Sequence, residues 1–217
     1  MKQTENLQVG LCGIGLQAYW GQFENLKSRL EDHLREVATR LSYPGVNLVN
    51  LGLIDKPARG LKAGHQFRSE NIDLLFIYVT TYAVSSIVLP LVQRAGVPVI
   101  LLKLQPDAAM DYTALSKLQN RTAMTGRWLE YCSACPLPEI ANVMKRAKIP
   151  LHQVTGTVKD DRVWVEIEEW VAAAKIKAGF RVSSYCKLLA PARHFEPTSS
   201  ECRDRRAIKH PLHGSPP

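Results

Sequence analysis

The sequence predicts an α/β fold, a flavodoxin- or Rossmann-like three-layer sandwich with a parallel sheet, plus a largely irregular C-terminal tail. Two observations predict this class. Short apolar runs alternate with amphipathic segments from residue 7 to about residue 178, and such alternation requires crossovers that make the strands parallel. The run DLLFIYV at residues 73–79 is apolar on both faces, which is typical of a central parallel strand.

Each expected element follows from a local pattern. Short apolar runs bounded by glycine, proline or polar residues predict strands. The segment 22–41 is expected to be helical because its apolar residues recur every three or four positions, whereas Gly60 and Gly64 weaken the prediction for 56–69. In chain order, we expect a strand at 7–13, a helix at 22–41, a strand at 46–51, a helix at 56–69, a strand at 73–79, a helix at 85–95, a strand at 97–102, a polar stretch at 103–127, a helix at 138–147, a strand at 151–155 and a helix at 163–177.

The chain divides into an α/β domain at residues 1–178 and a basic, Pro/Ser-rich tail at residues 179–217. The tail has no apolar periodicity and buries too little apolar surface to offset its ordering entropy. We therefore expect it to be disordered or to be the product of out-of-frame translation.

Composition is that of a soluble globular protein, with 46% hydrophobic and 22% charged residues. No apolar run is long enough to span a bilayer, and the first residues lack the pattern of a signal peptide. Half of the net charge of +8 lies in the tail, without a nucleic-acid-binding motif or interleaved aromatic residues. We expect a cytoplasmic protein that binds neither nucleic acid nor membranes.

Five cysteines are present, an odd number that argues against a disulfide framework. Cys132 and Cys135 have CxxC spacing. We interpret them as buried or helix-end thiols. Zinc binding or redox use is the alternative, since either would need a particular structural context.

Polar loops follow three neighbouring strands. The third strand leads into a set of hydroxyl side chains, namely Thr80, Thr81, Tyr82, Ser85 and Ser86, and further polar loops lie at residues 15–21 and 103–107. The carboxyl ends of parallel strands meet at one edge of a sheet, where ligands bind. Aromatic, amide and hydroxyl groups suit a polyhydroxylated ligand. The alternative is that Tyr19 and Trp20 only pack the first loop onto the core.

A dinucleotide site is a third possibility, because residues 13–18 fit the GxGxxA pattern after a strand. The amphipathic pattern begins only after Gly21, however, so the loop is longer than the fingerprint allows. Asp55 is also too far along the chain to be the fingerprint's acidic residue. We therefore disfavour this interpretation.

Three segments resemble a known family. They are GLQAYWG, YVTTYAVSSIVLPLVQRAGVPVILLKLQPDAAMDY and RTAMTGRWLEYCSACPLPEIANVMKRAKIPLHQVTG. They are similar to the N-terminal part of the L-arabinose/L-fucose isomerase-like proteins, and the resemblance covers residues 7–178. Arg121 departs from the pattern, since arabinose isomerases have a glutamine before Thr-Ala.

The resemblance implies an aldose–ketose isomerase that uses a divalent metal, typically manganese, and works as a homo-oligomer on a sugar. The family's metal ligands and acid/base glutamate lie in later domains. No catalytic residue, metal ligand or bound cofactor is therefore expected in this chain. By position, the resemblance implies that Gln17, Tyr19, Thr81 and Tyr82 bind the substrate.

The tail does not resemble the family's second domain. The first hypothesis is therefore a truncated substrate-contacting and assembly domain of an isomerase-like protein, inactive alone. The alternative is a stand-alone sugar-binding or interaction module that associates with a full-length isomerase subunit.

Overall fold

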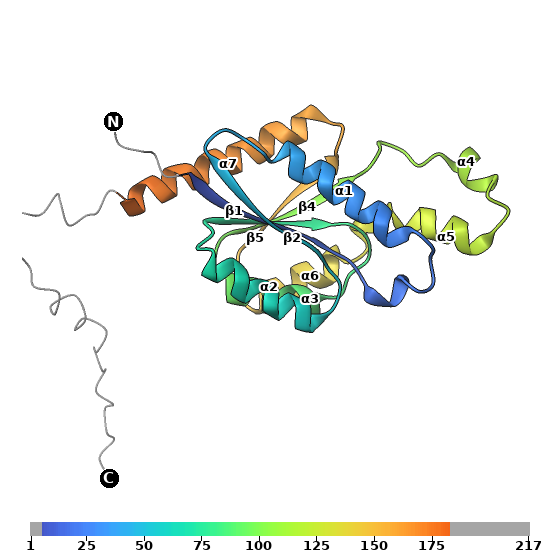
Figure 1. Ribbon diagram of the computed structural model, residues 1–217, viewed down its shortest axis with the longest axis horizontal. Helices are drawn as coiled ribbons and strands as arrows, with labels where there is room; N and C mark the ends of the chain where they lie inside the picture. The colour runs from blue at the N-terminus through green and yellow to red at the C-terminus, as the bar shows by residue number, and fades with distance from the viewer. Residues whose placement is uncertain (1–5, 183–217) are drawn as a thin grey trace, which may run out of the picture. The chain divides into compact units, whose positions relative to one another are not determined.

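A parallel five-stranded sheet in the order β2-β1-β3-β4-β5 forms the centre of the protein. The computed structural model describes residues 6–182. Helices α1 and α7 cover one face of the sheet, and α2, α3 and α6 cover the other (Figure 1). The predicted α/β sandwich is confirmed.

The strands are β1 (Leu7–Ile14), β2 (Val46–Ile54), β3 (Leu74–Val79), β4 (Val99–Gln105) and β5 (Leu151–Thr157). The helices are α1 (Leu26–Arg40), α2 (Pro57–Ser69), α3 (Ser85–Ala95), α4 (Tyr112–Ser116), α5 (Arg121–Leu129), α6 (Leu137–Arg146) and α7 (Asp161–Val182), with 3-10 turns η1 (Gln17–Tyr19) and η2 (Cys132–Ala134).

The largest differences from the predicted elements lie in two places. The first long helix begins at Leu26 rather than at residue 22, because the chain turns through Asn25, whose φ is 57°. The polar stretch 103–127 contains two helices that apolar periodicity did not reveal. Both have side-chain caps: Asp111 accepts a hydrogen bond from the backbone N–H of Ala114 in α4, and Asn120 does the same for α5.

The apolar core lies in two layers, one on each side of the sheet. Every side chain of β3 is buried, and alternate residues of this strand enter opposite layers because successive side chains of a strand point to opposite faces. Leu75, Ile77 and Val79 belong to the layer under α2, α3 and α6. Leu74, Phe76 and Tyr78 belong to the layer under α1 and α7.

Gly60 and Gly64 bring α2 into close contact with α3. A Cβ atom at Gly60 would lie 2.2 Å from the carbonyl oxygen of Ile87, and one at Gly64 would lie 2.5 Å from that of Leu91. Both distances are shorter than atoms tolerate. The two residues that lower the helix propensity of α2 are therefore the ones that permit its packing.

The last helix, α7, continues past the predicted domain boundary at residue 178. The predictions for the tail concern residues that, from 183 on, lie outside the described part and stay predictions. Between residues 6 and 182, no helix is both long enough and apolar enough to cross a membrane.

We expect Gly60→Ala to lower the free energy of unfolding by about 1–3 kcal/mol, because the added methyl group forces α2 and α3 apart. This effect outweighs the gain of about 1 kcal/mol in helix propensity. Urea denaturation of the full chain measures it. Lys62→Ala is the matched control, since Lys62 is exposed on the same helix and should change stability by less than about 0.5 kcal/mol. Equal effects of the two substitutions would contradict the packing role.

Candidate functional site

The sheet order places a topological switch point between β1 and β3. The chain leaves β1 towards α1 on one face and leaves β3 towards α3 on the other (Figure 1). Loops that diverge in this way open a crevice at the carboxyl edge of a parallel sheet, which is where ligands of such folds bind. The loops predicted to carry the site, residues 15–21 and 80–86, both begin here.

Asp55, directly after β2, anchors the loop that follows β1. Its carboxylate is buried and accepts hydrogen bonds from Trp20 Nε1 at 2.8 Å and from Arg59 Nη1 at 3.2 Å. Burial raises the pKa of Asp55, but these hydrogen bonds and the charge of Arg59 bring the pKa below its ordinary value. The backbone N–H of Gln17 also donates to the Asp55 carbonyl. Trp20 therefore holds the loop in place, as the packing alternative predicted for this residue.

The two threonines after β3 use their hydroxyl groups inside the protein. Thr80 Oγ1 donates to the Ile14 carbonyl at 2.8 Å, which ties the end of β3 to the end of β1. Thr81 Oγ1 donates to the Leu129 carbonyl at 2.7 Å, and its side chain is fully buried. The structure thus places Thr81 beneath the surface, where it positions the loop that carries Tyr82.

Three polar side chains remain at the surface of this edge. Gln17 is exposed, and Tyr19 and Tyr82 are half-buried. Tyr82 OH lies 3.4 Å from Glu139 Oε2, and the same carboxylate accepts hydrogen bonds from Ser85 N at 2.8 Å and Ser85 Oγ at 2.6 Å. Gln17, Tyr19, Tyr82 and Glu139 are called the carboxyl-edge patch below.

Glu139 was not among the predicted site residues. Its position in the first turn of α6 is visible in the sequence, but its contact with Ser85 depends on α6 packing beside α3. The hydrogen bonds from Ser85 lower the pKa of Glu139 below its ordinary value. The carboxylate therefore stays charged and occupies the positive N-terminal end of α3.

The tyrosines of the patch lie close to the cysteine pair. Burial raises the pKa of Tyr19, and the neighbouring Cys132, Tyr82 and Cys135 raise it further. Burial, Glu139 and Cys135 likewise raise the pKa of Tyr82. Both hydroxyl groups are therefore protonated at neutral pH and can donate hydrogen bonds to a ligand.

A hollow of about 430 Å³ lies beside the patch, between the β1–α1 loop and α5. This volume falls within the range of small-molecule sites. Phe23 lines the hollow and packs edge-to-face against Tyr19, with ring centroids 5.7 Å apart. Amide, hydroxyl and guanidinium groups line much of the remainder, from Gln22, Asn25, Arg29, Asn120, Thr122 and Arg127.

Glu130 fixes α5 against α1 through Arg29 and Arg127, which both line this hollow. The buried carboxylate accepts hydrogen bonds from Arg29 Nε at 2.5 Å and Arg127 Nη1 at 3.2 Å. His33 Nε2 lies 3.6 Å from Glu130 Oε2. Burial raises the pKa of Glu130, but the interactions with His33, Arg29 and Arg127 outweigh it, so the pKa is below its ordinary value.

The third predicted polar loop, residues 103–107, directs its carboxylate to other partners. Asp107 forms an ion pair with Lys159, and Tyr131 OH lies 3.4 Å from Asp107 Oδ2. The carboxylate is therefore engaged near the start of α7.

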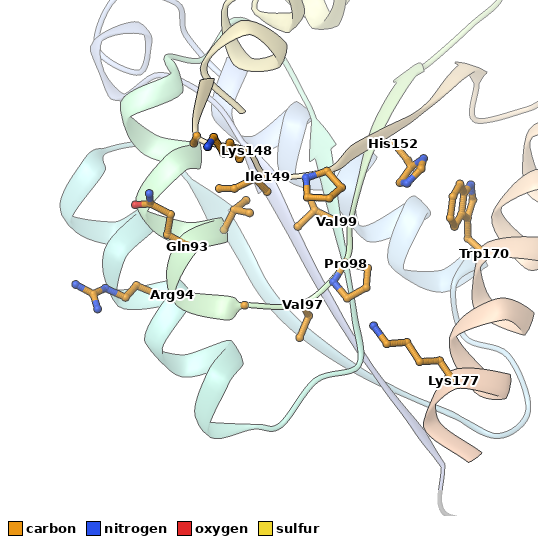
Figure 2. A pocket seen from close by; sticks show the side chains of 14 residues that line it. Gln93, Arg94, Val97, Pro98, Val99, Lys148, Ile149, His152, Trp170 and Lys177 are labelled. Carbon is orange, nitrogen blue, oxygen red and sulfur yellow. The ribbon is translucent and has the colours of Figure 1, made fainter. Parts of the chain in front are cut away.

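A second and larger hollow, about 930 Å³, lies at the opposite edge of the sheet (Figure 2). Arg94, Lys148 and Lys177 contribute positive charge to its lining, and the rings of His152 and Trp170 lie with centroids 4.4 Å apart. We favour the smaller hollow as the candidate site in spite of its size. The switch point and the polar loops lie at the carboxyl edge, whereas the larger hollow lies at the amino ends of β4 and β5.

Across residues 6–182, no three His, Cys, Asp or Glu side chains gather in an arrangement that could hold a metal ion. The groups that converge at the patch are instead hydrogen-bond donors and acceptors beside aromatic rings.

Comparison with known proteins does not identify a family. No protein-family model matches the chain, and no curated protein is significantly similar to it. A solved structure from Bacteroides fragilis NCTC 9343, titled a "putative acylhydrolase", is similar to it with a TM-score of 0.37 and 14% sequence identity. The likeness covers 82% of this chain and 89% of that one.

These findings overturn the predicted family. The resemblance to L-arabinose/L-fucose isomerase-like proteins was wrong, and so were the isomerase function, its manganese and the alternative of a module that pairs with an isomerase subunit. The physical reason is that polar loops at the carboxyl ends of parallel strands occur in many α/β sandwiches with unrelated activities. The pattern therefore indicates the fold but not the family. The positions implied for ligand contact, Gln17, Tyr19, Thr81 and Tyr82, stay predictions.

We expect Glu130→Gln to lower the free energy of unfolding by about 1–3 kcal/mol at neutral pH, because Arg29 and Arg127 lose a charged acceptor. Since folding lowers the pKa of Glu130, its stabilisation is present above the ordinary pKa of 4.5 and is lost as the pH falls through the folded-state pKa. The difference between wild type and variant should therefore shrink below about pH 4.5.

Urea denaturation of both proteins between pH 3 and pH 7 measures this difference. Glu31→Gln is the matched control, because Glu31 is partly exposed and, within residues 6–182, pairs only with Lys27 at 3.6 Å. A difference that stays constant across this pH range would argue against the ionised carboxylate as its source.

Proposed function

We propose that this domain binds a small, neutral ligand carrying neighbouring hydroxyl groups at the carboxyl-edge patch. The observation that carries the proposal is the placement of Gln17, Tyr19 and Tyr82 on the two loops that leave the switch point between β1 and β3. The Gln17 amide forms no side-chain hydrogen bond with any other described residue, so it is available to a ligand. An amide and two protonated phenols offer both donors and acceptors to hydroxyl groups.

The charge at the patch favours a neutral ligand. An anion would ordinarily find a positive site at the N-terminus of α3, but the Glu139 carboxylate already accepts the Ser85 N–H there. A phosphate or carboxylate group on the ligand would meet this negative charge at short range. A hydroxyl group, in contrast, can donate to Glu139.

The adjoining hollow gives such a ligand room and an aromatic wall. Phe23 and Tyr19 present ring surface at the boundary between patch and hollow, and the apolar face of a polyhydroxylated ring can stack there. The proposal concerns binding, and assigns no reaction to the domain. The sugar ligand, the homo-oligomer, the lack of a bound cofactor and the lack of nucleic-acid and membrane partners stay predictions.

A titration followed by NMR or calorimetry tests this proposal. The panel consists of free sugars and other neutral polyols, together with their phosphate esters. We expect at least one neutral compound to bind and its phosphate ester to bind more weakly, because of Glu139. Tighter binding of the phosphate esters, or no binding by any neutral compound, would refute the proposal.

We expect Gln17→Ala and Tyr82→Phe each to weaken binding of the neutral ligand about fivefold, since each removes one hydrogen bond worth about 1 kcal/mol. The same titration measures both variants. Gln66→Ala, an exposed amide on α2, is the matched control and should leave the affinity unchanged. Thr122→Val changes the lining of the hollow and distinguishes binding there from binding on the patch. If this variant alone weakens binding, the ligand lies in the hollow and not on the patch.

A further inference from the structure

Two cysteines at the carboxyl edge form a pair that the binding proposal does not use. Cys132 Sγ and Cys135 Sγ lie 2.8 Å apart, at the two ends of the turn η2. A disulfide bond is about 2.05 Å long, so closure needs an approach of less than about 1 Å. The backbone N–H of Cys135 donates to the Cys132 carbonyl at 3.2 Å, which keeps the turn closed.

The two sulfurs differ in their access to solvent. Cys132 is 4% exposed and packs with Leu26, Leu30 and Leu129 in a small apolar cluster. Cys135 is exposed. Only one member of the pair can therefore meet a reagent from solution, while the other is held directly behind it. This is the arrangement of an attacking thiol with a resolving thiol.

We propose that Cys132 and Cys135 form a reversible dithiol–disulfide site that exchanges with low-molecular-weight disulfides, with Cys135 as the attacking and Cys132 as the resolving cysteine. This inference is independent of the ligand proposed for the patch. It makes the domain a thiol-redox protein whose reactive sulfur lies next to Tyr19 and Tyr82.

The exchange needs no other oxidant, because the small disulfide accepts the two electrons that the cysteine pair loses. The Cys135 thiolate attacks one sulfur of R–S–S–R, that bond breaks, and the first thiol leaves. Cys132 then gives its proton to solvent and attacks Cys135 Sγ, and the second thiol leaves as the intramolecular disulfide forms. Two cysteines are oxidised by two electrons, and one small disulfide is reduced to two thiols.

The environment of Cys132 sets the order of these steps. Burial, with the hydrogen bond to Cys135, raises the pKa of Cys132 to about 12. Cys132 therefore keeps its proton at neutral pH, and its sulfur becomes a nucleophile only when that proton is removed. Closure should consequently be slower than the first attack and should accelerate as the pH rises.

The test treats the reduced full-length chain with oxidised glutathione under native conditions and follows the tryptic peptide of residues 128–145 by mass spectrometry. This peptide contains Cys132 and Cys135 and no other cysteine, so the remaining cysteines do not interfere. We expect a transient glutathione adduct, followed by a peptide that is two hydrogens lighter than the dithiol form. Dithiothreitol should restore the dithiol.

Three variants assign the roles. Cys132→Ser should stop at a stable adduct on Cys135, and Cys135→Ser should react at least about tenfold more slowly, because Cys132 is buried. Cys12→Ala is the matched control, since Cys12 is fully buried in the apolar core, and the peptide of residues 128–145 should react in this variant as it does in the wild type.

Results with the native wild-type protein decide the proposal even if a variant fails to fold. A wild-type peptide that keeps both thiols, or that stays as the glutathione adduct without closing, would overturn it. Closure only in urea would also overturn it, because the native geometry would then play no part. One equivalent of zinc in the purified protein, with both thiols protected from glutathione, would assign the pair to metal binding instead.

Discussion

The pairing of β1 with β3 is the constraint on which the rest of the structure depends. These two strands are adjacent in the sheet although a strand and two helices separate them in the chain. The chain leaves β1 towards one face of the sheet and leaves β3 towards the other. Helices therefore cover both faces, and the loops diverge at the carboxyl edge between the two strands. Thr80, whose hydroxyl and backbone N–H both donate to the Ile14 carbonyl, fixes the point at which the two strands separate.

The sequence predicted those features that depend on local pattern. Strands such as β3 and long helices such as α7 follow from apolar runs and spacing, and they appear close to the predicted positions. Helices α4 and α5 were not predicted because they are short and mostly exposed. Capping residues such as Asp111 mark where they begin, and they have no long apolar face. The glycines of α2 weakened the prediction of this helix for a related reason. They permit close packing against α3, and a local sequence pattern carries no information about that contact.

The sequence indicated the edge of the sheet at which the candidate site lies, but not which side chains reach the surface there. Polar loops after neighbouring strands indicated that Gln17, Tyr19 and Tyr82 lie at the carboxyl edge of the sheet. The burial of Thr81 depends on the Leu129 carbonyl, 48 residues away in the chain, and the presence of Glu139 depends on the packing of α6 beside α3. The predicted family was wrong because polar loops at this edge occur in many α/β proteins with different activities.

The α4–α5 segment is fastened at its two ends and exposed between them. Asp107 pairs with Lys159 near its start, and Glu130 pairs with Arg29 near its end; the segment extends beyond the carboxyl edge of the sheet (Figure 1). Because its attachments do not involve its middle, its length and composition can change without altering the register of any strand. Evolution can therefore remodel one wall of the neighbouring hollow while leaving the sheet and the switch point intact.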